Sequence, residues 1–85
     1  MKTREYLIAK PVNNGMEIYV SLGGVAYFLM SHRWNSRLFA YLRDGKSLSE
    51  IRSFKPERNQ GMQKLHRSLA YMLRVIDSLS YECAA

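Results

Sequence analysis

The sequence predicts an α+β fold in which a three-stranded antiparallel meander precedes three helices, in the order β-β-β-α-α-α. The hydrophobic residues repeat with a period of about two as far as Met30 and with a period of about 3.6 after it. Two dipeptides that favour tight turns, Asn14-Gly15 and Gly23-Gly24, divide the first part into three segments. A chain of 85 residues has the length of one domain, so we predict a single domain over residues 1–85.

The three segments of the first part each have the features of a strand. Residues 4–10 mix β-formers with charged residues and stop before Pro11, which cannot donate to a sheet and so suits an edge strand. Residues 16–22 alternate between apolar and polar side chains, which predicts a half-buried strand. Residues 25–30, V-A-Y-F-L-M, are rich in β-branched and aromatic side chains, which favours a third strand.

The next part of the chain predicts two helices. Residues 32–44 have helical periodicity, with Ser31 as a suitable N-cap and Gly45 directly after the end. The second, short helix is predicted over residues 48–54, because S-L-S-E, residues 47–50, has the spacing of a capping box with Ser47 as the cap.

A third helix is predicted over residues 60–79, followed by a tail of residues 80–85. Its apolar residues recur every three or four positions, which predicts one buried face. The residues of this face are Met62, Leu65, Leu69, Met72, Leu73, Ile76 and Leu79.

Composition and charge limit the kinds of partner. Thirteen Lys and Arg against seven Asp and Glu give a formal net charge of +6, an excess that attracts nucleic acid, anionic lipid or an acidic protein or peptide. The most apolar stretch, residues 18–30, is shorter than the ~20 residues that cross a bilayer. Glu5 interrupts the apolar run that a signal peptide needs, and the single Cys83 cannot form an internal disulfide. We therefore predict a cytoplasmic protein without a transmembrane segment.

No pattern in the sequence predicts catalysis. The carboxylates are scattered, so no pair stands out for general acid and base work. His32, His66 and Cys83 are too few and too far apart for a zinc site, and no phosphate-binding glycine motif occurs. We predict a binding protein that is not an enzyme, with no catalytic residues, no cofactor and no metal.

Four residues of the third helix step by three, four and three positions and lie nearly opposite its apolar face. This basic stripe consists of Lys64, Arg67, Tyr71 and Arg74. The only acidic residue near it in sequence is Asp77, so the stripe has the composition that phosphate binding uses. Further phosphate contacts are predicted for Arg52, Lys55 and Arg58. The alternative interpretation is an ordinary solvated helix face.

The segment L-R-D-G-K-S-L-S-E-I, residues 42–51, resembles the junction in helix-turn-helix and winged-helix regulators, where a glycine stops one helix and a capped helix follows. This resemblance implies a DNA-binding, transcription-regulatory protein in which the last helix contacts the duplex, in this chain through the basic stripe. The sequence departs from that pattern in its long connection from Phe54 to Gly61 and in having no strand pair after the last helix.

A second resemblance indicates a different partner. The element order, with D-G-K-S-L-S-E-I between the first two helices, is similar to that of PqqD-like peptide-binding domains. That resemblance implies capture of a peptide as an added strand, here along residues 25–30 and the outer side of residues 65–72. A third alternative is a small homodimeric interaction protein, whose aromatic residues fill a core or a dimer face. The aromatic residues considered for this role are Tyr6, Tyr19, Tyr27 and Trp34.

Overall fold

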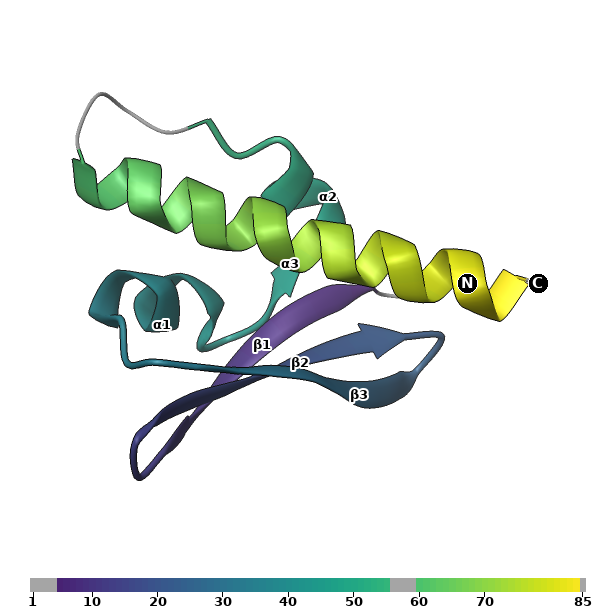
Figure 1. Ribbon diagram of the computed structural model, residues 1–85, viewed down its shortest axis with the longest axis horizontal. Coiled ribbons are helices and arrows are strands. Elements are labelled where there is room, and N and C mark those ends of the chain that lie inside the picture. The colour runs from purple at the N-terminus through teal and green to yellow at the C-terminus, as the bar shows by residue number, and fades with distance from the viewer. Residues whose placement is uncertain (1–4, 56–59, 85) are drawn as a thin grey trace.

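The structure is a computed structural model that describes residues 5–55 and 60–84. Its helices lie on one face of an antiparallel sheet (Figure 1). The predicted α+β class and the order of three strands followed by helices are confirmed, and a short fourth strand is added between the first two helices. The elements are β1 (Tyr6–Val12), β2 (Gly15–Leu22), β3 (Val25–His32), α1 (Ser36–Leu42), β4 (Lys46–Ser47), α2 (Leu48–Arg52) and α3 (Gln60–Ala84).

The sheet has the strand order β3-β2-β1-β4, and every neighbouring pair is antiparallel. β3 therefore forms one edge of the sheet and β4 the other. The sequence does not predict β4, because two residues are too few to show a period. β4 forms by pairing with Tyr6 and Leu7 of β1, and directly after it the Leu48 N–H donates to the carbonyl oxygen of Glu5 at 2.9 Å.

The two hairpin turns differ in how well the sequence predicts them. Gly23 and Gly24 connect β2 to β3 as predicted, with φ angles of 60° and 82°. The first turn consists of residues 13 and 14, so the prediction of a turn at Asn14-Gly15 is wrong by one position. Gly15 instead belongs to β2, with a φ of 150°, and a Cβ atom there would collide with the carbonyl oxygen of His32. The close approach of β3 therefore requires glycine at this position.

β1 ends later than predicted. It continues through Pro11, which pairs with Met16, and ends at Val12. On the other side of β1, β4 pairs only with Tyr6 and Leu7, so no strand of residues 5–55 or 60–84 lies beside Pro11 there. A proline is tolerated in a strand at such an unpaired position, because its missing N–H removes no sheet hydrogen bond.

Helix α1 starts four residues later than predicted. Ser31 and His32 pair with β2 as the end of β3, so the prediction of Ser31 as the N-cap is wrong. Asn35 caps the helix instead, and its side chain accepts a hydrogen bond from the Leu38 N–H at 3.1 Å. The helix ends at Leu42, two residues before the predicted end.

The other two helices also differ from the prediction at their C-terminal ends. Ser47 caps α2 as predicted, since its hydroxyl accepts a hydrogen bond from the Glu50 N–H at 3.2 Å, but α2 ends at residue 52 rather than 54. α3 continues to residue 84, so the predicted end at residue 79 and the tail from residue 80 are wrong. Residues 80–84 contain neither Gly nor Pro and so do not interrupt the helix.

The hydrophobic core lies between the sheet and the helices. It consists of Leu7, Ala9, Met16, Ile18, Val20, Leu38, Leu42, Leu48, Ile51, Leu65, Leu69, Met72 and Ile76. The predicted apolar face of α3 is thus buried along its middle, but Leu79 is 38% exposed, so its predicted burial is wrong. Figure 1 shows the reason: the C-terminal part of α3 extends past the end of the β2–β3 hairpin.

Candidate nucleic-acid interface

The basic stripe lies on the outer side of α3. Leu65, Leu69 and Met72 are buried against the sheet and α1, which turns the opposite side of the helix toward solvent. All four residues of the stripe are exposed, and Tyr71 is the most exposed large apolar or aromatic side chain of the described residues, at 59%. At 3.6 residues per turn, the four positions fall within an arc of about 80°. They therefore form one continuous surface.

The cations of the stripe have no acidic partner within residues 5–55 and 60–84. The ion pairs of this part of the chain are Arg43 with Asp44, at 3.9 Å, and Arg52 with Asp77. The positive charge of the stripe is thus not neutralised by an acidic side chain of these residues, which leaves it available to an anion.

Asp77 follows Arg74 by three residues and is the acidic group that helical spacing would pair with the stripe. Its carboxylate instead accepts two hydrogen bonds from the Arg52 guanidinium, at 2.7 and 3.3 Å. These hydrogen bonds, together with the attraction between the two opposite charges, lower the pKa of Asp77 and raise the pKa of Arg52. The pair joins α2 to α3, and Asp77 forms its ion pair with Arg52 rather than with Arg74.

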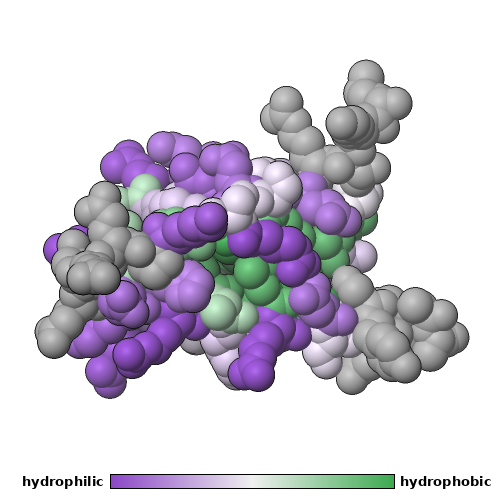
Figure 2. Space-filling model, turned by 90° about the horizontal axis from the view of Figure 1, so that it is seen from above, coloured by the Kyte–Doolittle hydropathy of each residue, from purple (hydrophilic) through white to green (hydrophobic). Residues whose placement is uncertain are grey.

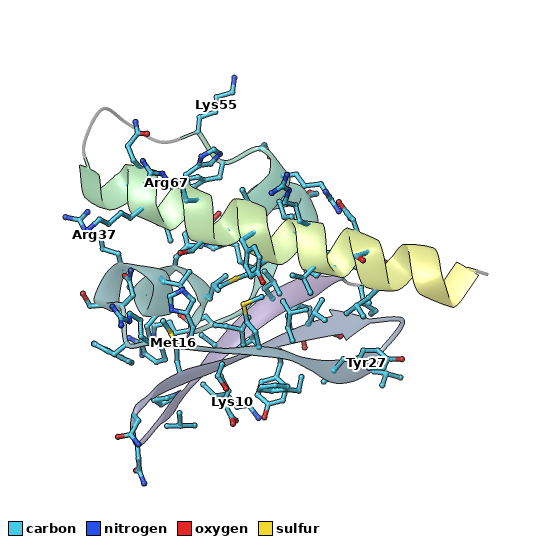
Figure 3. The ribbon with its side chains drawn as sticks, in the orientation of Figure 1. Lys10, Met16, Tyr27, Arg37, Lys55 and Arg67 are labelled. Carbon is cyan, nitrogen blue, oxygen red and sulfur yellow. The ribbon has the colours of Figure 1, made fainter. Side chains whose placement is uncertain are left out.

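The predicted additional contacts do not all join the stripe. Arg52 is held by Asp77, which leaves it less able to contact a phosphate. Lys55 is exposed just after α2 and points away from the molecule (Figure 3). Arg58 lies outside the described residues.

Arg37 of α1 is a cation that no pattern in the sequence singles out. Its guanidinium lies across the start of α3, where a Cβ atom on Gly61 would be 2.7 Å from Arg37 Cζ. Figure 3 shows Arg37, Lys55 and Arg67 at the end of the molecule where α3 begins. Hydrophilic residues gather at the same end in Figure 2, which looks onto the helix side. The small residue at position 61 is the only sequence signal for this contact.

The two histidines of the chain are engaged in packing. The His66 ring stacks on Phe54 with the ring centroids 6.0 Å apart, and Phe54 also contacts Tyr41 edge to face. These contacts attach the segment after α2 to α3. His32 Nε2 lies 3.5 Å from the Ser68 hydroxyl and so links the end of β3 to α3. Within the described parts of the chain, no three His, Cys, Asp or Glu side chains cluster in a way that could hold a metal ion.

β3, the strand predicted to receive a peptide, is an edge strand with exposed apolar side chains. Val25, Tyr27 and Phe28 are 51%, 48% and 53% exposed. Tyr27 and Trp34, which is 53% exposed, therefore do not fill the core. Tyr19 is half-buried on the sheet face opposite the helices, where its ring meets Phe28 edge to face at 5.7 Å. Peptide capture at β3 stays a prediction.

Among the described residues, no helix has the length and hydropathy that a membrane-spanning segment needs. Comparison of the chain with protein families, with curated proteins and with solved structures finds no match. The resemblances to helix-turn-helix regulators and to PqqD-like domains therefore stay predictions based on residues 42–51 and on the order of the elements.

Proposed function

We propose that this protein is a non-catalytic nucleic-acid-binding domain that contacts duplex DNA through the outer face of α3. The observation that carries the proposal is that Lys64, Arg67 and Arg74 are all exposed on one side of one helix without an acidic partner among the described residues. A solvated helix face usually carries both signs of charge, whereas Asp77, the acidic group nearest in sequence to this stripe, is paired with Arg52.

The dimensions of the stripe suit a phosphate backbone. Lys64 and Arg74 are ten residues apart, which corresponds to about 15 Å along the helix axis. Phosphates of one strand recur about every 3.4 Å of duplex axis, so the stripe is long enough to contact several of them. Tyr71 lies between Arg67 and Arg74, where its hydroxyl is placed to donate to a phosphate oxygen.

We propose contact with the DNA backbone rather than sequence reading. The seven residues that connect Arg52 to Gln60 exceed the three or four of a typical helix-turn-helix turn. α2, with five residues, is also short for the supporting helix of such a unit. Phosphate contacts position a protein on DNA but carry no sequence information directly. We therefore expect the protein to bind duplex DNA of any sequence, with an affinity that falls steeply as the salt concentration rises. The proposed location of this binding is the cytoplasm.

The proposal is tested by fluorescence anisotropy with a labelled random duplex and a triple variant in which Lys64, Arg67 and Arg74 are replaced by Ala. If counterion release supplies the whole effect, loss of three phosphate contacts weakens binding by up to about 500-fold at 0.1 M salt. The matched control replaces three exposed cations outside α3, and it has the same net charge as the stripe variant. The control residues are Lys10, Arg33 and Arg43.

The two triple variants separate a localised surface from a general charge effect. We expect the control variant to keep most of the affinity, because its three cations lie on β1, before α1 and after α1. Equal losses in both variants would show that only net charge matters. Absent binding by the wild-type protein would refute the proposed function.

A further inference from the structure

The two edges of the sheet differ in how they are protected against another strand. At one edge, β4 has only two residues, and the uncovered remainder of β1 contains Lys10 and Pro11. Short edge strands, lysine and proline are the features by which proteins prevent edge pairing. At the other edge, β3 has eight residues and carries no charged residue from Val25 to Ser31. Only a register irregularity, opposite Ile18 and Tyr19 of β2, interrupts it.

The main-chain groups of β3 that face outward can be assigned from the hairpin. Leu22 and Val25 flank the two-residue turn, so they exchange hydrogen bonds with each other, and the pairs alternate from there. Val25 and Tyr27 therefore direct their N–H and C=O groups toward β2. Ala26 and Phe28 direct theirs outward, to the side where the described part of the chain places no strand.

We propose that β3 pairs with β3 of a second copy of this chain, antiparallel, about a two-fold axis at Tyr27. In this register each Ala26 lies opposite Phe28 of the other copy, and these pairs exchange hydrogen bonds through the outward groups. A small side chain then faces a large one, which avoids crowding of two phenyl rings. The two Tyr27 residues lie opposite each other as the pair that makes no hydrogen bonds, where side chains are closest. Figure 3 shows Tyr27 on β3 near the β2–β3 turn.

The charges of the chain favour a second copy as the occupant. An acidic or basic peptide would find no opposite charge between Val25 and Ser31. Two copies of this uncharged segment bring no like charges together, although each chain has a net charge of +6. Arg33, the first charged residue after β3, is six residues from the axis, so the two Arg33 residues are roughly 40 Å apart and screened from each other.

The pairing has a consequence for the helices. Antiparallel addition continues one sheet with its faces unchanged, because the two-fold axis is perpendicular to the sheet. The helices of both copies therefore lie on the same side of the joined sheet. If α3 binds DNA as proposed above, the dimer presents two basic stripes to the same side, but the dimer itself does not depend on that function.

Sedimentation velocity of the protein without nucleic acid, over a series of concentrations, tests the proposal. The regular part of β3 is short, so we expect a reversible dimer whose fraction rises with concentration. Tyr27→Lys places two ammonium groups face to face at the axis and is expected to give a monomer. The control is Val12→Lys, at a β1 position that is 46% exposed, and it is expected to dimerise like the wild type. Thermal melts of both variants verify that they fold.

Cross-linking tests the register. A pair without hydrogen bonds has Cα atoms about 4.5 Å apart, within the range that a disulfide spans. In a Cys83→Ser background, Tyr27→Cys is therefore expected to form a disulfide-linked dimer under mild oxidation, whereas Val12→Cys is not. A wild-type protein that stays monomeric at every concentration, or equal cross-linking at both positions, would overturn the proposal. Monomeric behaviour would leave the β3 edge open to a peptide of another protein.

Discussion

The ion pair between Arg52 and Asp77 should limit the affinity of the protein for DNA. Asp77→Asn removes the carboxylate that holds the Arg52 guanidinium at 2.7 Å, and it removes a negative charge one helical turn from Arg74. Both effects make the surface beside the basic stripe more positive. We therefore expect the variant to bind duplex DNA more tightly than the wild-type protein does.

The expected gain in DNA affinity of Asp77→Asn has two contributions. Coulomb repulsion in water between a carboxylate and a phosphate about 10 Å apart corresponds to about a twofold change in affinity, so removal of the carboxylate strengthens binding by that factor. If the released Arg52 then contacts a phosphate, one further counterion is displaced, which adds up to about eightfold at 0.1 M salt. The pair is exposed, so the free energy of unfolding should change little.

Fluorescence anisotropy with a random duplex measures this change. Asp44→Asn is the matched control, because it also removes one exposed carboxylate beside an arginine, at 3.9 Å, but lies after α1 rather than on α3. We expect the control to strengthen binding by less than twofold. An equal effect of the two substitutions, or weaker binding by Asp77→Asn, would show that Asp77 does not limit the positive charge of the stripe.

Three further predictions concern stability. The Met72 side chain of α3 is fully buried in the core, so Met72→Ala should lower the free energy of unfolding by about 2 to 5 kcal/mol in urea titrations. Gly15→Ala should lower the midpoint of thermal unfolding, because the added Cβ meets the His32 carbonyl oxygen; Gly23→Ala, where nothing lies within 4 Å, should lower it less. Arg52 lowers the pKa of Asp77, so the pair stabilises the native state above the unfolded-state pKa, and this contribution is lost as the pH falls through the native pKa. The ordinary pKa of an aspartic acid side chain is 3.8, and the native pKa of Asp77 is lower. The small difference in unfolding free energy between the wild type and Asp77→Asn should therefore disappear as the pH falls from 3.8 through the native pKa. Urea titrations at several pH values measure this difference.

Local signals account for the parts of the fold that the sequence predicts well. The Gly23-Gly24 turn and the Ser47 cap each depend on a few neighbouring residues, and both occur where predicted. Elements that depend on distant parts of the chain are missed. β4 exists because it pairs with β1, about 40 residues earlier, and Ser31 belongs to β3 because β2 lies beside it.

The candidate site shows the same division. The 3.6-residue period of α3 is sufficient to predict that Lys64 and Arg67 lie away from the apolar face. The partner of Asp77 is not predictable in this way, since Arg52 is 25 residues away in sequence and competes with the nearer Arg74. The contact of Arg37 with the start of α3 likewise depends on how α1 packs, which no local pattern encodes.

The decisive measurement for DNA binding by the outer face of α3 is its salt dependence. For the wild-type protein, we expect the logarithm of the association constant to fall with the logarithm of salt concentration with a slope of about −2.7 or steeper, as for three or more phosphate contacts. Replacement of Lys64, Arg67 and Arg74 by Ala should remove about 2.7 from that slope, and replacement of the three control cations should leave it nearly unchanged. A wild-type slope near zero, or the same slope in the stripe variant, would contradict the claim that the outer face of α3 binds DNA.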